Sequence, residues 1–131
     1  MNPPVNSPSA QLLGRDILAR DTQTGEVRVR YEARPEFLNR NGFIQGGFLA
    51  AMLDSATGLA LGGHVPEGGT AATIRLETRY LKPVKPGPVF ARAWLIEVEG
   101  RDAHIEGELA NAAGEIVATA TAVFRIRRPR G

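Results

Sequence analysis

The sequence predicts an α+β fold in which one long buried helix is wrapped by a curled antiparallel sheet of about five or six strands. Only residues 46–61 have the length and composition of a long helix. The segments on either side alternate apolar and polar residues, which is typical of strands that bury one face. Strands and helices do not alternate as they do in parallel sheets, so the sheet is expected to be antiparallel and to curl over the helix.

The length and composition indicate one ordinary domain that spans residues 1–131. Apolar residues make up 43% of the chain and charged residues 23%, as in an average globular protein. Residues 1–8 are polar and proline-rich, and we expect residues 1–10 to be flexible. The chain shows neither a secretory signal nor a run of roughly 20 apolar residues, and it contains no cysteine. We therefore expect a cytoplasmic protein that does not enter a membrane.

The basic residues are concentrated at the C-terminal end. The formal charge is +2, but without four arginines near the C-terminus the chain would carry 12 basic and 14 acidic residues. The aromatic residues are few and are not interleaved with the basic ones, which argues against a nucleic-acid partner. We interpret these arginines as a solvated strand edge followed by a basic tail at residues 128–131; they are Arg125, Arg127, Arg128 and Arg130.

The N-terminal third is predicted to form a hairpin that leads into a loop. Residues 14–21 show a short apolar alternation, and residues 26–32 alternate strictly after a polar turn. Residues 35–38 break this alternation, and residues 39–42 have the Asn and Gly composition of a turn. In the second strand of the hairpin, three side chains are expected to face the core: Val27, Val29 and Tyr31.

The helix at residues 46–61 begins with Gly46 and Gly47 and is closed by a Gly-Gly pair at residues 62–63. Its apolar residues occupy all sides, so we expect it to be buried. Asp54 is its one charged side chain, and a buried carboxylate is costly unless it is paired or its pKa rises. Asp54 is therefore either a functional group or an acid paired at an interface, and we favour function.

The remaining strands are predicted at residues 72–80, 89–99, 101–111 and 115–127, and they form a long antiparallel meander. Residues 82–88 contain three prolines and must be a connection. A curled sheet has exposed edges, and pairing with a second copy would cover two of them. The sequence therefore favours a homodimer.

Residues near the helix start suit a reaction on a carbonyl group. Free N–H groups at Gly46 and Gly47 could bind an anion or polarise a carbonyl, although a closely packed helix start is an alternative. Asn39 and Gln45 add amide groups that donate and accept hydrogen bonds. Gln45 lies nine residues before Asp54, about 13 Å along a helix. Such a separation favours a site shared by two chains.

The segment from Asn39 to Asp54 resembles the hotdog-fold acyl-CoA thioesterases of the phenylacetate-degradation type. The family pattern has an Asn, a Gly three residues later, a His-Gly-Gly triplet, and an Asp nine residues after the His. Here Asn39, Gly42, Gly46, Gly47 and Asp54 occupy these positions, and Gln45 stands in the place of the usual His. The resemblance extends over residues 14–127. It implies a central helix wrapped by a sheet, assembled as dimers or dimers of dimers.

The resemblance also implies hydrolysis of an acyl-CoA at the subunit interface, with no cofactor other than the coenzyme A of the substrate. Asp54 would activate water as a general base or attack as a nucleophile. The Gly46 N–H would polarise the thioester carbonyl, and Gly47 would contact the substrate beside it. Asn39 would help to place the water or Asp54 of the other chain, and Thr73 would assist Asp54 with its hydroxyl. Gln45, in the place of the histidine, can still offer hydrogen bonds to the site.

Other chemistry-bearing residues receive weaker interpretations. Lys82, Lys85 and Arg101 are candidates for binding the coenzyme A phosphates. His64 and His104 lack the spacing of metal ligands, and we predict no metal site. Ser55 is interpreted as a residue that packs the helix. Phe90 and Trp94 are expected either to fill the core between sheet and helix or to line an acyl tunnel.

Two functional alternatives remain beside the thioesterase. One is a non-catalytic module that binds acyl-CoA or an acyl-carrier protein and has lost efficient turnover because Gln45 replaces histidine. The other is a hotdog-fold hydratase or dehydratase, which would need a paired histidine and acid. Release of thiol from a panel of acyl-CoAs would separate the first alternative from the enzyme.

Overall fold

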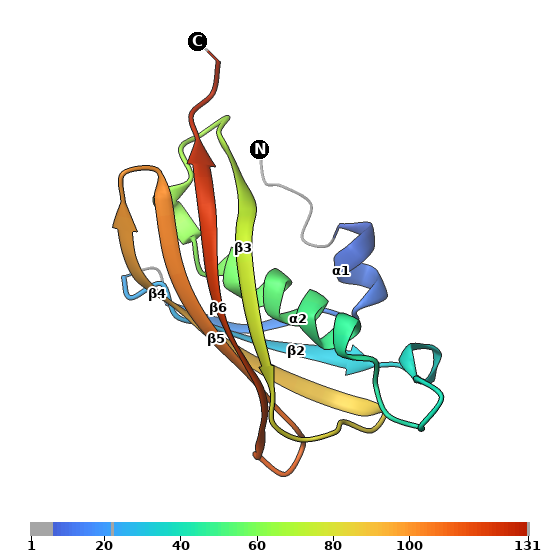
Figure 1. The fold of residues 1–131 in the computed structure, drawn as a ribbon. Helices are drawn as coiled ribbons and strands as arrows, with labels where there is room; N and C mark the ends of the chain where they lie inside the picture. Colours follow the sequence, from blue (N-terminus) through green and yellow to red (C-terminus); the bar gives the residue numbers. More distant parts are fainter. Residues whose placement is uncertain (1–6, 22, 131) are drawn as a thin grey trace.

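The computed structural model describes residues 7–21 and 23–130, and it has the predicted α+β architecture. One long helix lies across the concave face of a six-stranded antiparallel sheet (Figure 1). The strands are hydrogen-bonded in the order β1-β2-β4-β5-β6-β3. The helices, including two 3-10 turns, are α1 (Pro8–Leu12), η1 (Pro35–Phe37), α2 (Gly46–Leu59) and η2 (Gly62–His64). The strands are β1 (Asp16–Arg20), β2 (Val27–Ala33), β3 (Thr70–Tyr80), β4 (Gly87–Glu99), β5 (Asp102–Ala110) and β6 (Ile116–Arg127).

The N-terminal hairpin is confirmed. Strands β1 and β2 pair antiparallel, with Asp16 opposite Arg30 and Arg20 opposite Val27. Alternate side chains of β2 enter the core, as the strict alternation predicted. The side chains of Val29 and Tyr31 are fully buried.

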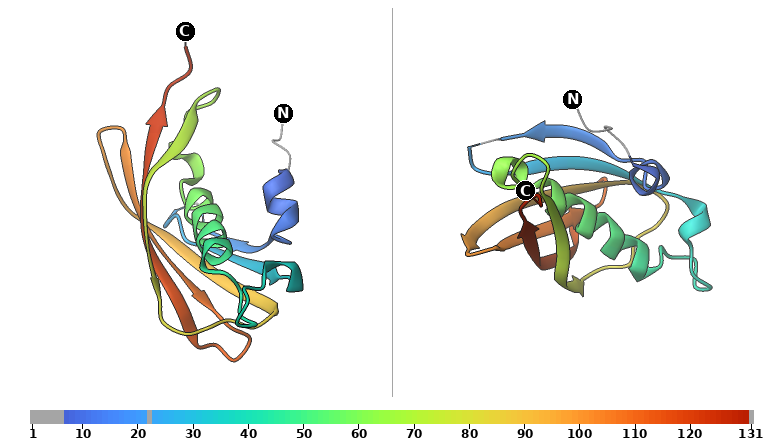
Figure 2. Two further views of the ribbon diagram at one scale, coloured as in Figure 1. Left: turned by 45° about the vertical axis from the view of Figure 1, so that its right-hand side comes forward. Right: turned by 90° about the horizontal axis from the view of Figure 1, so that it is seen from above.

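Helix α2 begins at the predicted residue and ends two residues earlier than expected. Gly62 adopts a φ of 53°, which lies in the left-handed region that terminates a helix at low steric cost. The helix is fully buried only where it faces the sheet, and its other side chains are partly exposed. The buried residues of α2 are Leu49, Met52, Leu53, Ala56 and Thr57. Figure 2 shows how the sheet curves around α2.

The meander prediction is right for β4, β5 and β6 and wrong for β3. Strand β3 pairs with β6, from Thr70 opposite Arg127 to Tyr80 opposite Ala118, and forms one edge of the sheet. The connection after β3 crosses the lower end of the sheet in Figure 1 and leads to β4, which pairs with β2 and β5 rather than with β3. Alternation of side chains fixes which face of a strand is buried, but it does not specify the neighbouring strand.

Phe90 and Trp94 do not fill the core between sheet and helix, contrary to one interpretation of the sequence. The buried residues of this part of β4 are Val89, Ala91 and Ala93, so residues between them point to the opposite face. Trp94 lies on that outer face, where the Arg92 guanidinium sits 4.7 Å from its ring centroid.

The N-terminal segment contains a short helix that the sequence did not predict. Helix α1 begins after Ser7, whose hydroxyl accepts a hydrogen bond from the Ala10 N–H at 3.3 Å. Ala10, the last residue of the segment expected to be flexible, and Leu13 after it are buried, whereas residues 7–9 are exposed. Residues 1–6 of that segment lie outside the described part of the chain. Within the described residues, no helix is long and apolar enough to cross a membrane.

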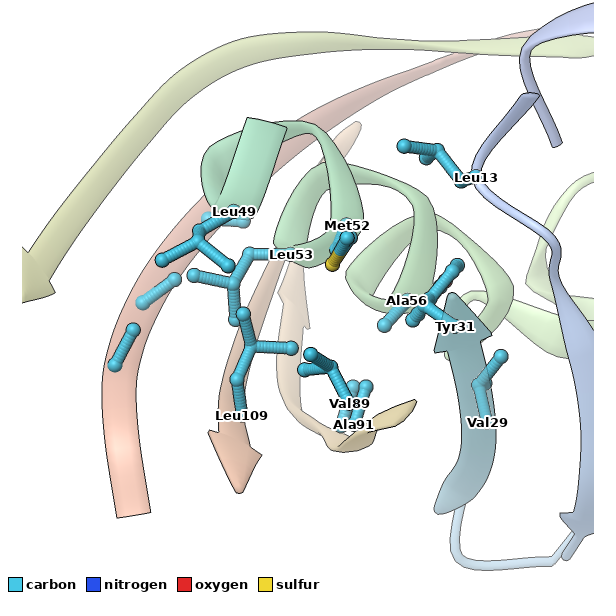
Figure 3. Close-up of a cluster of buried hydrophobic side chains, with 14 of the residues drawn as sticks. Leu13, Val29, Tyr31, Leu49, Met52, Leu53, Ala56, Val89, Ala91 and Leu109 are labelled. Carbon is cyan, nitrogen blue, oxygen red and sulfur yellow. The ribbon is translucent and has the colours of Figure 1, made fainter. Parts of the chain in front are cut away.

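Gly107 of β5 packs closely against Thr57 of helix α2. An added Cβ at Gly107 would lie 3.1 Å from the Thr57 methyl carbon and 3.4 Å from the Arg92 carbonyl oxygen. Around this contact, side chains from α2 and several strands form one continuous core (Figure 3). A glycine is therefore needed here for packing, since a side chain would push α2 away from the strands.

We predict that Gly107→Val lowers the free energy of unfolding by about 1–3 kcal/mol, because the new side chain overpacks the helix–sheet contact. Denaturation by urea measures this change. Gly63→Val is the matched control, since an added Cβ at Gly63 meets no atom within 4 Å. If the two substitutions lowered the free energy of unfolding equally, the close contact at Gly107 would not be the cause of the loss.

Candidate active site

Asp54 is joined to the edge strand β3 by a hydrogen bond. The Thr73 hydroxyl donates to Asp54 Oδ1 at 2.7 Å, across 19 residues of sequence. Thr73 lies next to a bulge in the pairing of β3 with β6, and it is opposite the buried Phe124. Among the described residues, Thr73 is the only hydrogen-bond partner of the carboxylate. Asp54 is only partly buried, and its Oδ2 has no hydrogen-bond partner among the described residues, so that oxygen is free to contact water.

A polar network lies beside Asp54 on the opposite flank of α2. Ser55 Oγ accepts hydrogen bonds from the Tyr31 hydroxyl at 2.8 Å and from Arg15 Nη1 at 3.3 Å. Burial raises the pKa of Tyr31 to about 12, while the bond to Ser55 and the charge of Arg15 oppose the rise. The interpretation of Ser55 as a packing residue thus becomes more specific, because its hydroxyl connects α2 to β2.

The start of α2 presents two free backbone donors. Gln45 precedes the helix, its N–H donates to the Phe37 carbonyl at 2.9 Å, and its own carbonyl accepts from the Phe48 N–H at 3.0 Å. In the described part of the chain, the N–H groups of Gly46 and Gly47 have no hydrogen-bond partner. They lie at the positive end of the helix dipole, where such groups bind anions or polarised carbonyl oxygens.

Tyr80, the last residue of β3, lies against this helix start and was not among the predicted site residues. Its hydroxyl donates to the Gly46 carbonyl at 2.8 Å, and its ring would lie 3.1 Å from a Cβ added at Gly46. The two residues are 34 positions apart, so no local pattern could have connected them. An added Cβ at Gly47 would meet nothing within 4 Å.

Asn39 orders the loop before α2. Its Oδ1 accepts hydrogen bonds from the Asn41 N–H at 2.9 Å and the Phe43 N–H at 3.2 Å. That oxygen is therefore occupied, which leaves the amide NH₂ of Asn39 as the group able to contact water. Asn39 and Gly46 line the same surface hollow as Tyr80 and Lys82.

The predicted phosphate-binding residues do not lie together in one chain. Lys82 pairs with Glu115 beside the hollow, and Lys85 is exposed in the following connection. Arg101 lies between β4 and β5, where it borders a second hollow. Four further arginines line that hollow, and one of them, Arg125, is paired with Asp102 at 2.9 Å: Arg125, Arg127, Arg128 and Arg130.

The histidines take no part in the site. His64 Nδ1 lies 3.1 Å from the Leu61 carbonyl oxygen within η2, and His104 belongs to β5. The described residues contain no group of three or more His, Cys, Asp or Glu side chains that could hold a metal ion.

One chain thus contains both parts of a possible reaction site, but the two parts lie far from each other. Asp54 could act as a base or nucleophile, and the N–H groups of Gly46 and Gly47 could stabilise an oxyanion. Eight residues separate Asp54 from Gly46, about 12 Å along the helix. Each half is attached to β3, Asp54 through Thr73 and Gly46 through Tyr80.

We predict that stability falls between about pH 10 and pH 12 because of Tyr31. An unfolded tyrosine loses its proton near pH 10, whereas the pKa of folded Tyr31 is about 12. The contribution of Tyr31 is complete below pH 10, and about 2–3 kcal/mol is lost as the pH rises through 12.

Free energies of unfolding measured from pH 9 to 12 for wild type and Tyr31→Phe check this prediction. The substitution should remove the part of the pH dependence that belongs to Tyr31. Parallel curves for the two proteins would contradict it.

Comparison with known proteins identifies a family. A family model described as the thioesterase superfamily matches residues 41–118. A proposed esterase from Halobacterium salinarum is 31% identical over 87 residues, which cover 63% of this chain and 57% of that relative. The chain therefore matches little more than half of the length of this curated relative.

Solved structures agree with this assignment over most of the chain. A phenylacetic acid degradation-related protein from Ralstonia eutropha is 34% identical, with a TM-score of 0.86 and coverage of 92% of both chains. The phenylacetic acid degradation protein PaaI from Thermus thermophilus is 31% identical, with a TM-score of 0.80 and coverage of 93% of this chain and 100% of that one. These matches confirm the hotdog fold. The chain belongs to the thioesterase superfamily.

Proposed function

We propose that the protein hydrolyses an acyl-CoA thioester to the free acid and coenzyme A, at a site shared by two copies of the chain. Membership of the thioesterase superfamily supports a thioester substrate. The partly buried Asp54, held by Thr73 and aligned on the helix that carries Gly46 and Gly47, supports hydrolysis. We further propose that it acts in the cytoplasm and needs no cofactor.

In the proposed reaction, Asp54 either removes a proton from water or attacks the thioester carbonyl itself. The Gly46 N–H donates to the carbonyl oxygen and stabilises the negative charge that develops there. In the first route, water adds to the carbonyl carbon, the C–S bond breaks, and the proton taken by Asp54 passes to the leaving thiolate. In the second route, the C–S bond breaks as the acyl group joins Asp54 in a mixed anhydride, and water then hydrolyses this anhydride to the free acid and supplies the proton of the thiol. Asn39 and Gln45 supply amide groups that place the water or the carbonyl.

The attachment of both site halves to β3 is the observation that carries the two-chain proposal. Thr73 and Tyr80 are seven residues apart, roughly 20 Å along a strand. If β3 pairs antiparallel with β3 of a second copy about a two-fold axis near Glu77, Thr73 of each chain lies close to Tyr80 of the other. Asp54 of one copy then faces the helix start of its partner.

The exposed edge of β3 supports this pairing. The strand is 11 residues long and has a neighbour on one side only, so its outer backbone groups are unpaired. Its apolar side chains are unusually exposed for their size, at 47% for Ile74 and 50% for Tyr80. Arg75 already pairs with Glu77 within the chain. In the proposed pairing the two Glu77 side chains lie close together, and the arginines on the diagonals beside them offset their like charge.

Substrate contacts follow from the same arrangement. Gly47 has open space where a side chain would project, which leaves room for the thioester. Lys82 and Lys85 follow Tyr80, so the proposed pairing brings them near the start of the partner's β3. We propose that these lysines and Arg101 bind the phosphates of coenzyme A.

The direct test of the activity is Asp54→Asn. The variant keeps an oxygen that can accept the Thr73 hydrogen bond but loses the carboxylate. We expect kcat for thiol release from acyl-CoAs to fall by at least about 10³-fold while the unfolding midpoint is kept.

Thr73→Val is a milder variant of the same test. It removes only the hydroxyl that donates to Asp54 and should lower kcat less than Asp54→Asn does. A wild-type protein that releases no thiol from acyl chains of any length, yet binds acyl-CoA, would favour the non-catalytic module. Full activity of Asp54→Asn would remove Asp54 from the reaction.

Mixing two inactive variants tests whether the site is shared. Asp54→Asn loses the carboxylate, and Gly47→Val fills the space beside the oxyanion donors. In a mixed dimer with a two-chain site, both defects fall in one site and the other site is intact. Random exchange of subunits should therefore restore about a quarter of the wild-type activity.

The readout is thiol release after the two proteins are unfolded together and refolded. Each variant treated alone is the control. If the site lies within one chain, every site carries a defect and the mixture remains inactive, which would contradict the proposal.

A further inference from the structure

The Tyr80 hydroxyl donates a hydrogen bond to the Gly46 carbonyl, a group that the helix can satisfy by itself. The carbonyl of Gly46, at the first position of α2, ordinarily accepts from the N–H four residues later. Tyr80 adds a second donor at 2.8 Å, which uses the other lone pair of the oxygen. Tyr80 is 50% exposed in one chain, so packing within that chain does not explain why this contact forms.

The Gly46 carbonyl belongs to the same peptide unit as the Gly47 N–H. Because the peptide is planar and delocalised, a group that holds the oxygen also fixes the direction of the N–H. A donor to the oxygen draws electron density from the nitrogen, and the N–H becomes a stronger donor. The Gly46 N–H is arranged in the same way, because the Gln45 carbonyl of its peptide accepts from the Phe48 N–H at 3.0 Å.

The glycine at position 46 is explained by this contact. A Cβ there would lie 3.1 Å from Tyr80 Cζ and 3.3 Å from its hydroxyl oxygen, so any side chain would displace the ring. Position 47 has no such restriction within one chain. The two glycines therefore serve different purposes, since Gly46 admits Tyr80 and Gly47 leaves its own N–H accessible.

We propose that Tyr80 is a positioning residue of the reaction site, which orients and polarises the Gly47 N–H as a second donor to the thioester oxygen beside the Gly46 N–H. This inference rests on the proposed thioesterase function. Tyr80 does not exchange a proton with the substrate; it acts through the peptide between Gly46 and Gly47. Two aligned donors at the helix start stabilise the oxyanion better than the Gly46 N–H alone.

Tyr80→Phe tests the inference, because it keeps the ring and removes only the hydroxyl. Complete loss of one oxyanion donor costs about 10²–10³ in kcat, and weakening it should cost about tenfold. We expect KM to stay within about twofold, since the contact strengthens as negative charge develops. The unfolding midpoint should move by no more than about 2 °C, because the ring is half-exposed.

A second readout does not need activity. In ¹⁵N-labelled protein, the Gly47 amide resonance should move upfield in Tyr80→Phe, since its N–H is less polarised. Tyr31→Phe is the matched control: it also deletes one tyrosine hydroxyl, but that hydroxyl donates to Ser55 rather than to Gly46. The control should lower the unfolding midpoint more than Tyr80→Phe does and leave the Gly47 resonance in place.

The outcomes separate the inference from the proposed function. An unchanged Gly47 resonance, or an unchanged kcat in Tyr80→Phe, overturns the role of Tyr80 even when the wild type is an active thioesterase. The role is also overturned if Tyr80→Phe lowers kcat together with stability and Tyr31→Phe lowers kcat by the same factor. If the wild type hydrolyses no thioester, the proposed function fails, while the resonance still tests whether Tyr80 polarises Gly47.

Discussion

The arrangement of the candidate site depends on the way in which helix α2 is held against the edge strand β3. Packing on the concave face fixes the distance of the helix from the sheet, and Gly107 leaves room for Thr57 of the helix. Two hydrogen bonds then fix it along the strand, one from Thr73 to Asp54 and one from Tyr80 to the Gly46 carbonyl. Apolar packing alone tolerates small shifts of a helix, whereas these two polar contacts specify one position.

Because one edge strand carries both contacts, the proposed reaction would depend on the proposed assembly of two chains. Within one chain, Asp54 and the free N–H groups are too far apart to act on the same carbonyl. Antiparallel pairing of β3 with a second copy would reverse one strand relative to the other and bring unlike halves together. The same pairing would satisfy the unpaired backbone groups of the edge and cover exposed side chains such as Ile74. Stability and activity would then be reached by a single association step.

The sequence predicted those features that local patterns determine. Strict alternation identified the core face of β2, and the Gly-Gly pairs marked both ends of α2. The cost of burying a charge singled out Asp54 before any fold was known. The resemblance to a family placed Thr73 beside it, and the 2.7 Å hydrogen bond agrees with that placement.

The missed features depend on contacts between distant parts of the chain. Strand β3 lies next to β6, and the proline-rich connection after it does not reveal from sequence which strand it will pair with. Tyr80 contacts Gly46 only because β3 takes that position. Core filling was one of two interpretations of Trp94, whereas the alternation of β4 gives the core face to Val89, Ala91 and Ala93. Helix α1 is too short for a periodic pattern to reveal it.

The absence of cysteine from the chain allows one direct measurement of the central claim, that β3 pairs with β3 of a second copy. A single cysteine introduced as Glu77→Cys lies near the proposed two-fold axis, and Arg28→Cys on β2 is the control far from that edge. Treatment with a short bis-maleimide should convert Glu77→Cys into a covalent dimer that retains thiol-releasing activity, and should leave Arg28→Cys monomeric on a denaturing gel. Equal cross-linking of the two variants, or none at position 77, would contradict the account.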